Sequence, residues 1–86
     1  MYLICVYDVK SKHCSKFMKV FRKYLFHVQE SVFEGELTPK QYKNLQQEIG
    51  KIITDDDQVI FYYSYNQKQI LKKAIGKTED KANIII

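Results

Sequence analysis

The start of the chain changes its hydrophobic period within a few positions, and this change is the strongest constraint on the fold. Tyr2–Tyr7 is a continuous apolar run rich in β-forming side chains, as expected of a central strand. From about Ser11, apolar residues recur every three or four positions, which is the period of an amphipathic helix: Cys14, Phe17, Met18, Phe21, Tyr24 and Leu25. The chain therefore begins with a strand that leads directly into a helix.

The middle of the chain predicts a second strand and a second helix. Side chains alternate in character over Val28–Leu37, where Gly35 marks either a bulge or a close approach of another backbone. The stretch Thr38–Gln41 has a threonine cap, a proline at the first helical position and a glutamine that completes a capping box. We expect this helix to end near Thr54.

The last third predicts a strand at Val59–Tyr65, a weaker strand at Gln69–Ile75 and a short tail strand at Ile84–Ile86. The order β-α-β-α-β-β favours a single α+β domain, residues 1–86, with a ferredoxin-like split βαβ plan. Both helices then cover one face of an antiparallel sheet, and a short C-terminal strand follows. The isoleucine tail needs a partner edge, which a neighbouring subunit could supply.

Composition narrows the class of protein. The 86 residues are 45% hydrophobic and 28% charged, which is typical of a compact globular domain and excludes multi-domain enzymes. Cys5 and Cys14 have neither metal-site nor disulfide-framework spacing, so both are expected in the core of a protein from a reducing compartment. No apolar stretch reaches the roughly 18 residues of a membrane span. We expect a cytoplasmic protein without membrane association.

Positive charge is segregated along the chain, although the net charge is only +4. Residues 1–29 carry +5, residues 30–57 carry −4 and residues 58–86 carry +3. A cationic row along one helix face suits a row of phosphates, and a solvated helix face is the equally weighted alternative. The candidate nucleic-acid-binding residues are Lys10, Lys12, Lys16, Lys19 and Arg22.

Asp8 is the one acid in that first segment and stands where the first strand ends. A carboxylate at the end of a central strand is well placed as a metal ligand, and a two-fold dimer would bring two such groups to one Mg²⁺. The alternative is that Asp8 only caps or turns the chain before the helix. His13 lies close in sequence as a potential acid or base, although a lone helical histidine is more often a solvated surface residue.

Two other groups of residues are interpreted structurally. Asp55–Asp57 lacks the ligand spacing and glycine of a calcium loop and is expected to form a solvated turn. Tyr62, Tyr63 and Tyr65 could stack nucleic-acid bases, but the glycine-aromatic signature of RNA-binding sheets is missing, so core packing is expected.

Three segments together resemble the family of the second CRISPR-associated (Cas) protein, which acts in CRISPR adaptation and antiviral defence. They are Tyr2–Val9, Val28–Leu37 and Ala74–Lys77. The most specific part is the Ser-Val-Phe-Glu-Gly string, Ser31–Gly35. The likeness extends over essentially the whole chain in length, element order and spacing.

The resemblance implies a ferredoxin-like homodimer in which Asp8 of each chain is catalytic and binds Mg²⁺ across the two-fold axis. Family members are metal-dependent endoribonucleases of single-stranded RNA, and some cut double-stranded DNA. They insert spacers together with the larger CRISPR integrase Cas1, and their tail strand joins the sheet of the other protomer. Ser31 and Phe33 would then lie near the dimer interface or the substrate, or simply pack in the strand.

Three alternatives to a nuclease of CRISPR adaptation stay open. A non-catalytic scaffold would brace DNA for the integrase with its basic faces and leave Asp8 without a role. A toxin-type ribonuclease of the same fold would act without an integrase. A ferredoxin-like module that senses a small molecule would leave the segregated lysines unexplained.

Overall fold

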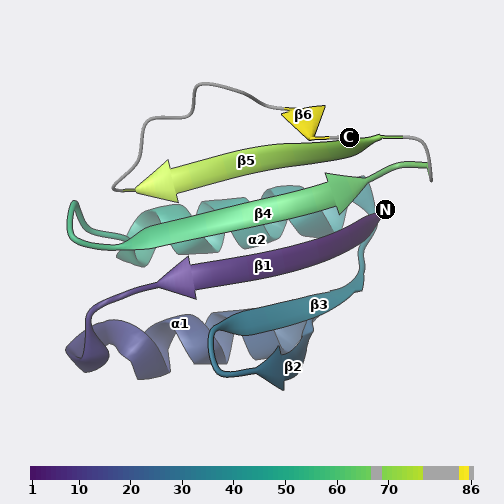
Figure 1. Ribbon diagram of the computed structural model, residues 1–86. Coiled ribbons are helices and arrows are strands. Elements are labelled where there is room, and N and C mark those ends of the chain that lie inside the picture. Colours follow the sequence, from purple (N-terminus) through teal and green to yellow (C-terminus); the bar gives the residue numbers. More distant parts are fainter. Residues whose placement is uncertain (67–68, 77–83, 86) are drawn as a thin grey trace.

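The computed structural model describes residues 1–66, 69–76 and 84–85. These residues form two helices and six strands in the order β1 (Tyr2–Asp8), α1 (Ser11–Tyr24), β2 (Phe26–Gln29), β3 (Val32–Glu36), α2 (Pro39–Ile52), β4 (Gln58–Ser64), β5 (Ile70–Gly76) and β6 (Ile84–Ile85). The strands form one sheet in the order β2-β3-β1-β4-β5-β6, and every neighbouring pair is antiparallel. Both helices cover the same face of this sheet (Figure 1). The predicted α+β plan is confirmed.

The core lies between the sheet and the helices. On β1 the buried side chains alternate with exposed or half-buried ones, as the two-residue period of a strand requires. Each fully buried large apolar side chain contributes about 1.5–3 kcal/mol to stability. The fully buried apolar residues are Leu3, Cys5, Phe17, Phe21, Phe33, Leu45, Ile49, Val59 and Phe61.

The capping box at the start of α2 is present as predicted. The Thr38 hydroxyl oxygen accepts a hydrogen bond from the Gln41 N–H at 3.1 Å, and the Gln41 side-chain oxygen accepts from the Thr38 N–H at 2.9 Å. Pro39 occupies the first helical position. Because the two partners satisfy two amides that lack helical acceptors, this local sequence is enough to start the helix.

The prediction of one strand over Val28–Leu37 is wrong. The structure has a hairpin there, with β2 and β3 joined by a turn at Glu30 and Ser31. This turn lacks the glycine, proline, asparagine or aspartate that usually signals one, so the alternation continues through it in the sequence. Gly35 stands in regular register opposite Leu3, so it is no bulge.

The other interpretation of Gly35, a close approach of another part of the backbone, is confirmed. A Cβ atom at this position would lie 3.2 Å from the Leu25 Cδ2 atom and 3.6 Å from the Tyr24 carbonyl oxygen. The end of α1 therefore packs directly on the backbone of β3.

The tail pairs with a different edge from the one predicted. The sequence favoured a neighbouring subunit, but in the structure Ile84 and Ile85 pair with Leu71 and Ile70 of the same chain's β5. The edge of β5 thus satisfies the tail's backbone. Lys77 and Ile86, which belong to the predicted motif and tail, lie outside the described residues.

Candidate functional site

Asp8 ends β1 on the face of the sheet that the helices leave open. Leu3, Cys5 and Tyr7 point into the core, so the alternating residues, Asp8 among them, point the other way. The Asp8 side chain is exposed, and Asp8 pairs with Gln58 on the neighbouring strand β4. The position predicted for a metal-binding carboxylate is therefore accessible.

A hollow of about 330 Å³ adjoins Asp8 and is lined by Asp8, Val9, Lys10, Asp56 and Gln58. Its carboxylate and amide oxygens are donors that suit Mg²⁺, which usually takes one or two carboxylates together with water and phosphate. Within the described part of the chain, however, no group of three or more His, Cys, Asp or Glu side chains could hold a metal ion. The possible oxygen ligands that one chain offers at this hollow are the carboxylates of Asp8 and Asp56 and the side-chain amide of Gln58.

Asp57 is a fully buried carboxylate that connects three segments beside this hollow. Its Oδ1 atom accepts a hydrogen bond from the Lys10 backbone N–H at 3.1 Å. Its Oδ2 atom accepts from the Thr54 N–H at 3.0 Å and hydroxyl at 2.9 Å, and lies 3.3 Å from His13 Nδ1. The turn that follows Asp8 is therefore anchored to the end of α2.

The prediction of a solvated turn at Asp55–Asp57 is wrong for Asp57. Burial raises the pKa of the Asp57 carboxyl, but hydrogen bonds from Lys10, Thr54 and His13 outweigh this effect and hold the pKa below its usual value. A negative charge beside the first turn of α1 is also favoured by the helix dipole. The N-cap residue of α1, Lys10, makes no capping hydrogen bond with its own side chain. The Asp57 carboxylate therefore stabilises the start of this helix from another segment of the chain.

The cations of α1 lie in the other layer of the molecule. Lys12, Lys16, Lys19 and Arg22 are all exposed, since the opposite side of this helix packs on the sheet through Phe17, Val20 and Phe21. Among the described residues, these four cations make no ion pair, whereas the neighbouring Lys23 pairs with Glu48 of α2. Of the predicted nucleic-acid-binding residues, only Lys10 shares the hollow with Asp8.

His13, Ser31 and Phe33 have structural contacts. The Nδ1 atom of His13 contacts the Asp57 carboxylate, and the His13 side chain is only 23% exposed. The Ser31 carbonyl accepts a hydrogen bond from the Tyr7 N–H at 3.1 Å. Phe33 is fully buried, with its ring 5.9 Å from Tyr7 and 5.2 Å from Phe21. Core packing accounts for Phe33.

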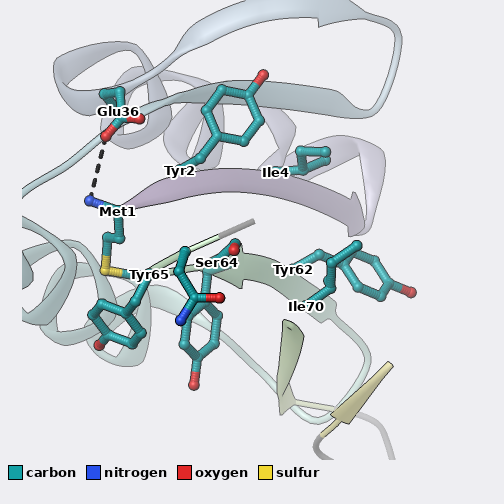
Figure 2. Close-up of a pocket in the computed structure, with 10 residues that line it drawn as sticks. Met1, Tyr2, Ile4, Glu36, Tyr62, Ser64, Tyr65 and Ile70 are labelled. Atoms are coloured by element: carbon teal, nitrogen blue, oxygen red, sulfur yellow. Dashed lines mark ion pairs between the residues drawn. The ribbon is translucent and has the colours of Figure 1, made fainter. Parts of the chain in front are cut away.

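The open face of the sheet carries exposed apolar side chains. Tyr2 is 40% exposed, Ile4 36%, and Phe26 on β2 79%. A wide hollow of about 710 Å³ runs over this face, and Figure 2 shows Tyr2, Ile4, Tyr62 and Ile70 around it. Large apolar side chains exposed on one face of a sheet are typical of a surface that binds another protein.

Two tyrosines depart from the core packing expected of them. Tyr63 packs against the core, but Tyr62 stands half-buried on the open face and Tyr65 is 61% exposed.

Asp57 is the residue that the sequence reasoning missed. The signal that could have found it is a threonine three residues before an aspartate, just after a helix, which is the spacing of a local side-chain turn.

Among the described residues, neither helix has an apolar stretch long enough to cross a bilayer.

Comparison with known proteins identifies relatives over nearly the whole chain. The sequence profile described as "CRISPR associated protein Cas2" matches residues 1–73. The protein named CRISPR-associated endoribonuclease Cas2 from Thermotoga maritima is 45% identical over 83 residues, covering 93% of this chain and 95% of the relative. The protein of the same name from Fusobacterium nucleatum is 37% identical over 89 residues, covering 96% and 84%.

Two solved structures that resemble this fold are also of Cas2 proteins. A structure described as "Crystal structure of cas2" superposes with a TM-score of 0.75 at 35% identity and covers 100% of this chain and 98% of its own. Cas2 of Streptococcus pyogenes at pH 6.5 superposes with a TM-score of 0.68 at 27% identity, covering 79% and 89%.

Proposed function

This chain belongs to the CRISPR-associated Cas2 family, and we propose that it acts as a homodimeric, Mg²⁺-dependent endoribonuclease of CRISPR adaptation. The observation that carries the proposal is the place of Asp8. It is exposed at the end of a central strand, on the same open face as the apolar side chains that a second copy would cover. A dimer formed through this face, with its two-fold axis parallel to the strands, would bring two Asp8 carboxylates to the same end of the interface.

The reaction is hydrolysis of a phosphodiester in single-stranded RNA or double-stranded DNA. Water adds to phosphorus, one P–O bond breaks, and the departing oxygen takes up a proton. Bound Mg²⁺ would supply Lewis-acid polarisation of the phosphate. The chain's own residues would contribute the two Asp8 carboxylates that hold the ion and the Lys10 ammonium groups that offset phosphate charge.

The test is cleavage of a labelled single-stranded RNA by purified Asp8→Asn, with Mg²⁺ titrated against EDTA. We expect the variant to lose cleavage while it keeps its fold and its dimer. Asp55→Asn is the matched control, because Asp55 is exposed in the nearby turn but does not line the hollow. Cleavage by Asp8→Asn at the wild-type rate would exclude Asp8 as the catalytic residue.

A second candidate function is a scaffold that braces DNA for the integrase Cas1 in the cytoplasm. It is favoured by the position of Lys12, Lys16 and Lys19 in the helix layer, behind the face on which Asp8 stands. These lysines can grip a duplex without any part in cleavage at Asp8.

The scaffold has its own experiment. Neutralising the three lysines to glutamine should weaken duplex binding and make the slope of log K against log salt shallower by about 0.9 for each phosphate that is no longer neutralised. If spacer acquisition survives Asp8→Asn but fails in the triple glutamine variant, the scaffold is the physiological role. A gene neighbourhood without an integrase would instead favour a toxin-type ribonuclease.

A further inference from the structure

Side chains of opposite charge flank the apolar part of the open face at one level across the sheet. Glu34 of β3 stands opposite Ile4 of β1, Ile4 opposite Tyr62 of β4, and Tyr62 opposite Lys72 of β5. Residues that stand opposite each other in antiparallel neighbours point to the same face. These four side chains therefore form a single row with an acid at one end and a lysine at the other.

This row lies on the open face. On β3 the buried residues are Phe33 and Gly35, so Glu34 between them points away from the helices. Ile4 and Tyr62 both line the wide hollow of the open face (Figure 2). Within the described part of the chain, neither Glu34 nor Lys72 has an ion-pair partner.

The row is complementary to itself under one kind of two-fold symmetry. An axis parallel to the strands, passing between β1 and β4, reverses the strand order and sets β3 of one subunit over β5 of the other. Packed sheets lie roughly 10 Å apart, a gap that glutamate and lysine side chains span together. The same axis leaves both copies of Asp8 at the same end of the sheet pair.

The other axis in the plane of the interface, perpendicular to the strands, is unfavourable. It keeps the strand order, so β3 faces β3 and β5 faces β5. When this axis passes through the row, Glu34 faces the partner's Glu34 and Lys72 faces the partner's Lys72, and like charges across an interface are strongly disfavoured. The charges thus distinguish the orientation that unites the Asp8 groups from one that separates them.

We propose that Glu34 of each subunit pairs with Lys72 of the other, and that these two symmetric ion pairs set the orientation of the dimer. The proposal rests on the homodimer in the proposed function and adds the residues that determine its geometry. The occupant of the open face is a second copy of this chain, because the row of one copy is complementary in charge to the row of another.

The test is charge reversal with oligomeric state as the readout, measured by sedimentation at about 0.15 M salt. In Glu34→Lys alone, or Lys72→Glu alone, both symmetric contacts become repulsive, and we expect the dimer Kd to rise at least about tenfold. When the two variants are mixed, both contacts become attractive again in the heterodimer. Native mass spectrometry should then show heterodimer in large excess over either homodimer.

Two matched controls change charge equally elsewhere. Glu30→Lys alters the exposed turn between β2 and β3, and Lys43→Glu alters the exposed side of α2. Neither should change the dimer Kd more than about twofold, since exposed charges outside an interface contribute little. Circular dichroism establishes that each variant is folded.

The outcomes separate this proposal from the proposed function. Dimerisation of Glu34→Lys with wild-type affinity, or a mixture with no excess of heterodimer, overturns the ion pairs while the Asp8 chemistry stands. A wild-type protein that stays monomeric overturns both. Selective heterodimers together with undiminished cleavage by Asp8→Asn support the ion pairs and reject the catalytic role of Asp8.

Discussion

Removal of the Asp57 carboxylate is the most informative perturbation of the fold around the site. In Asp57→Ala the Lys10 and Thr54 backbone N–H groups lose their acceptor, as do the Thr54 hydroxyl and the His13 ring. Each part-buried donor left without a partner costs about 1–3 kcal/mol. The wild-type protein also pays a desolvation penalty for burying the Asp57 charge, and the variant no longer does, which offsets part of the cost of the unpaired donors. We therefore expect a net loss of about 3 kcal/mol in the free energy of unfolding.

The assay is urea unfolding at pH 7, supported by thermal melting. A loss of about 3 kcal/mol lowers the Tm of a domain of this size by about 12 °C or more. Asp55→Ala is the control, because Asp55 is exposed in the same turn and should change the free energy by less than about 0.5 kcal/mol. If Asp57→Ala is as stable as Asp55→Ala, the carboxylate does not anchor the turn.

The difference between wild type and Asp57→Ala should also depend on pH. The folded protein holds the pKa of Asp57 below its usual value, so the charged carboxylate stabilises the fold above the unfolded pKa of about 3.9. This stability is lost as pH falls from that value through the folded pKa. The two unfolding curves should therefore converge under acid conditions, and a difference that stays constant down to pH 2 contradicts this reasoning.

Three substitutions test the local structure by urea unfolding. Gly76→Ala should cost at least about 2 kcal/mol, because Gly76 has φ +96° and its added Cβ would lie 2.2 Å from the Asp57 carbonyl oxygen. Gly50→Ala should stabilise by about 0.5–1 kcal/mol, because a Cβ there meets nothing within 4 Å and alanine favours helix. Thr38→Ala should cost about 1 kcal/mol through loss of the cap. The opposite sign at either glycine, or an unchanged midpoint for Thr38→Ala, would contradict the structure.

The features of the fold that could be predicted are those formed by residues close together in the sequence. The capping box needs only Thr38 and Gln41, and the basic face of α1 follows from a helical period alone. The hairpin at Glu30 and Ser31 escaped prediction because ordinary residues form its turn, and tertiary pairing with β1 determines where β3 begins.

The site shows the same division. The exposed end of β1 at Asp8 follows from strand alternation, so the sequence was sufficient to place it. The role of Asp57 depends on Lys10, a residue 47 positions away, which only the folded chain brings near. The row from Glu34 to Lys72 spans four strands, and its existence depends on register that no local pattern reveals.

The pairing of Asp8 at a two-fold axis is tested most directly by the stoichiometry of divalent-ion binding. Isothermal titration of the wild-type protein with Mn²⁺, as a probe for Mg²⁺, should give one ion for every two chains. Asp8→Asn should abolish that binding while the protein remains a folded dimer. One ion bound by each chain, or equal binding by the variant, would contradict a shared site.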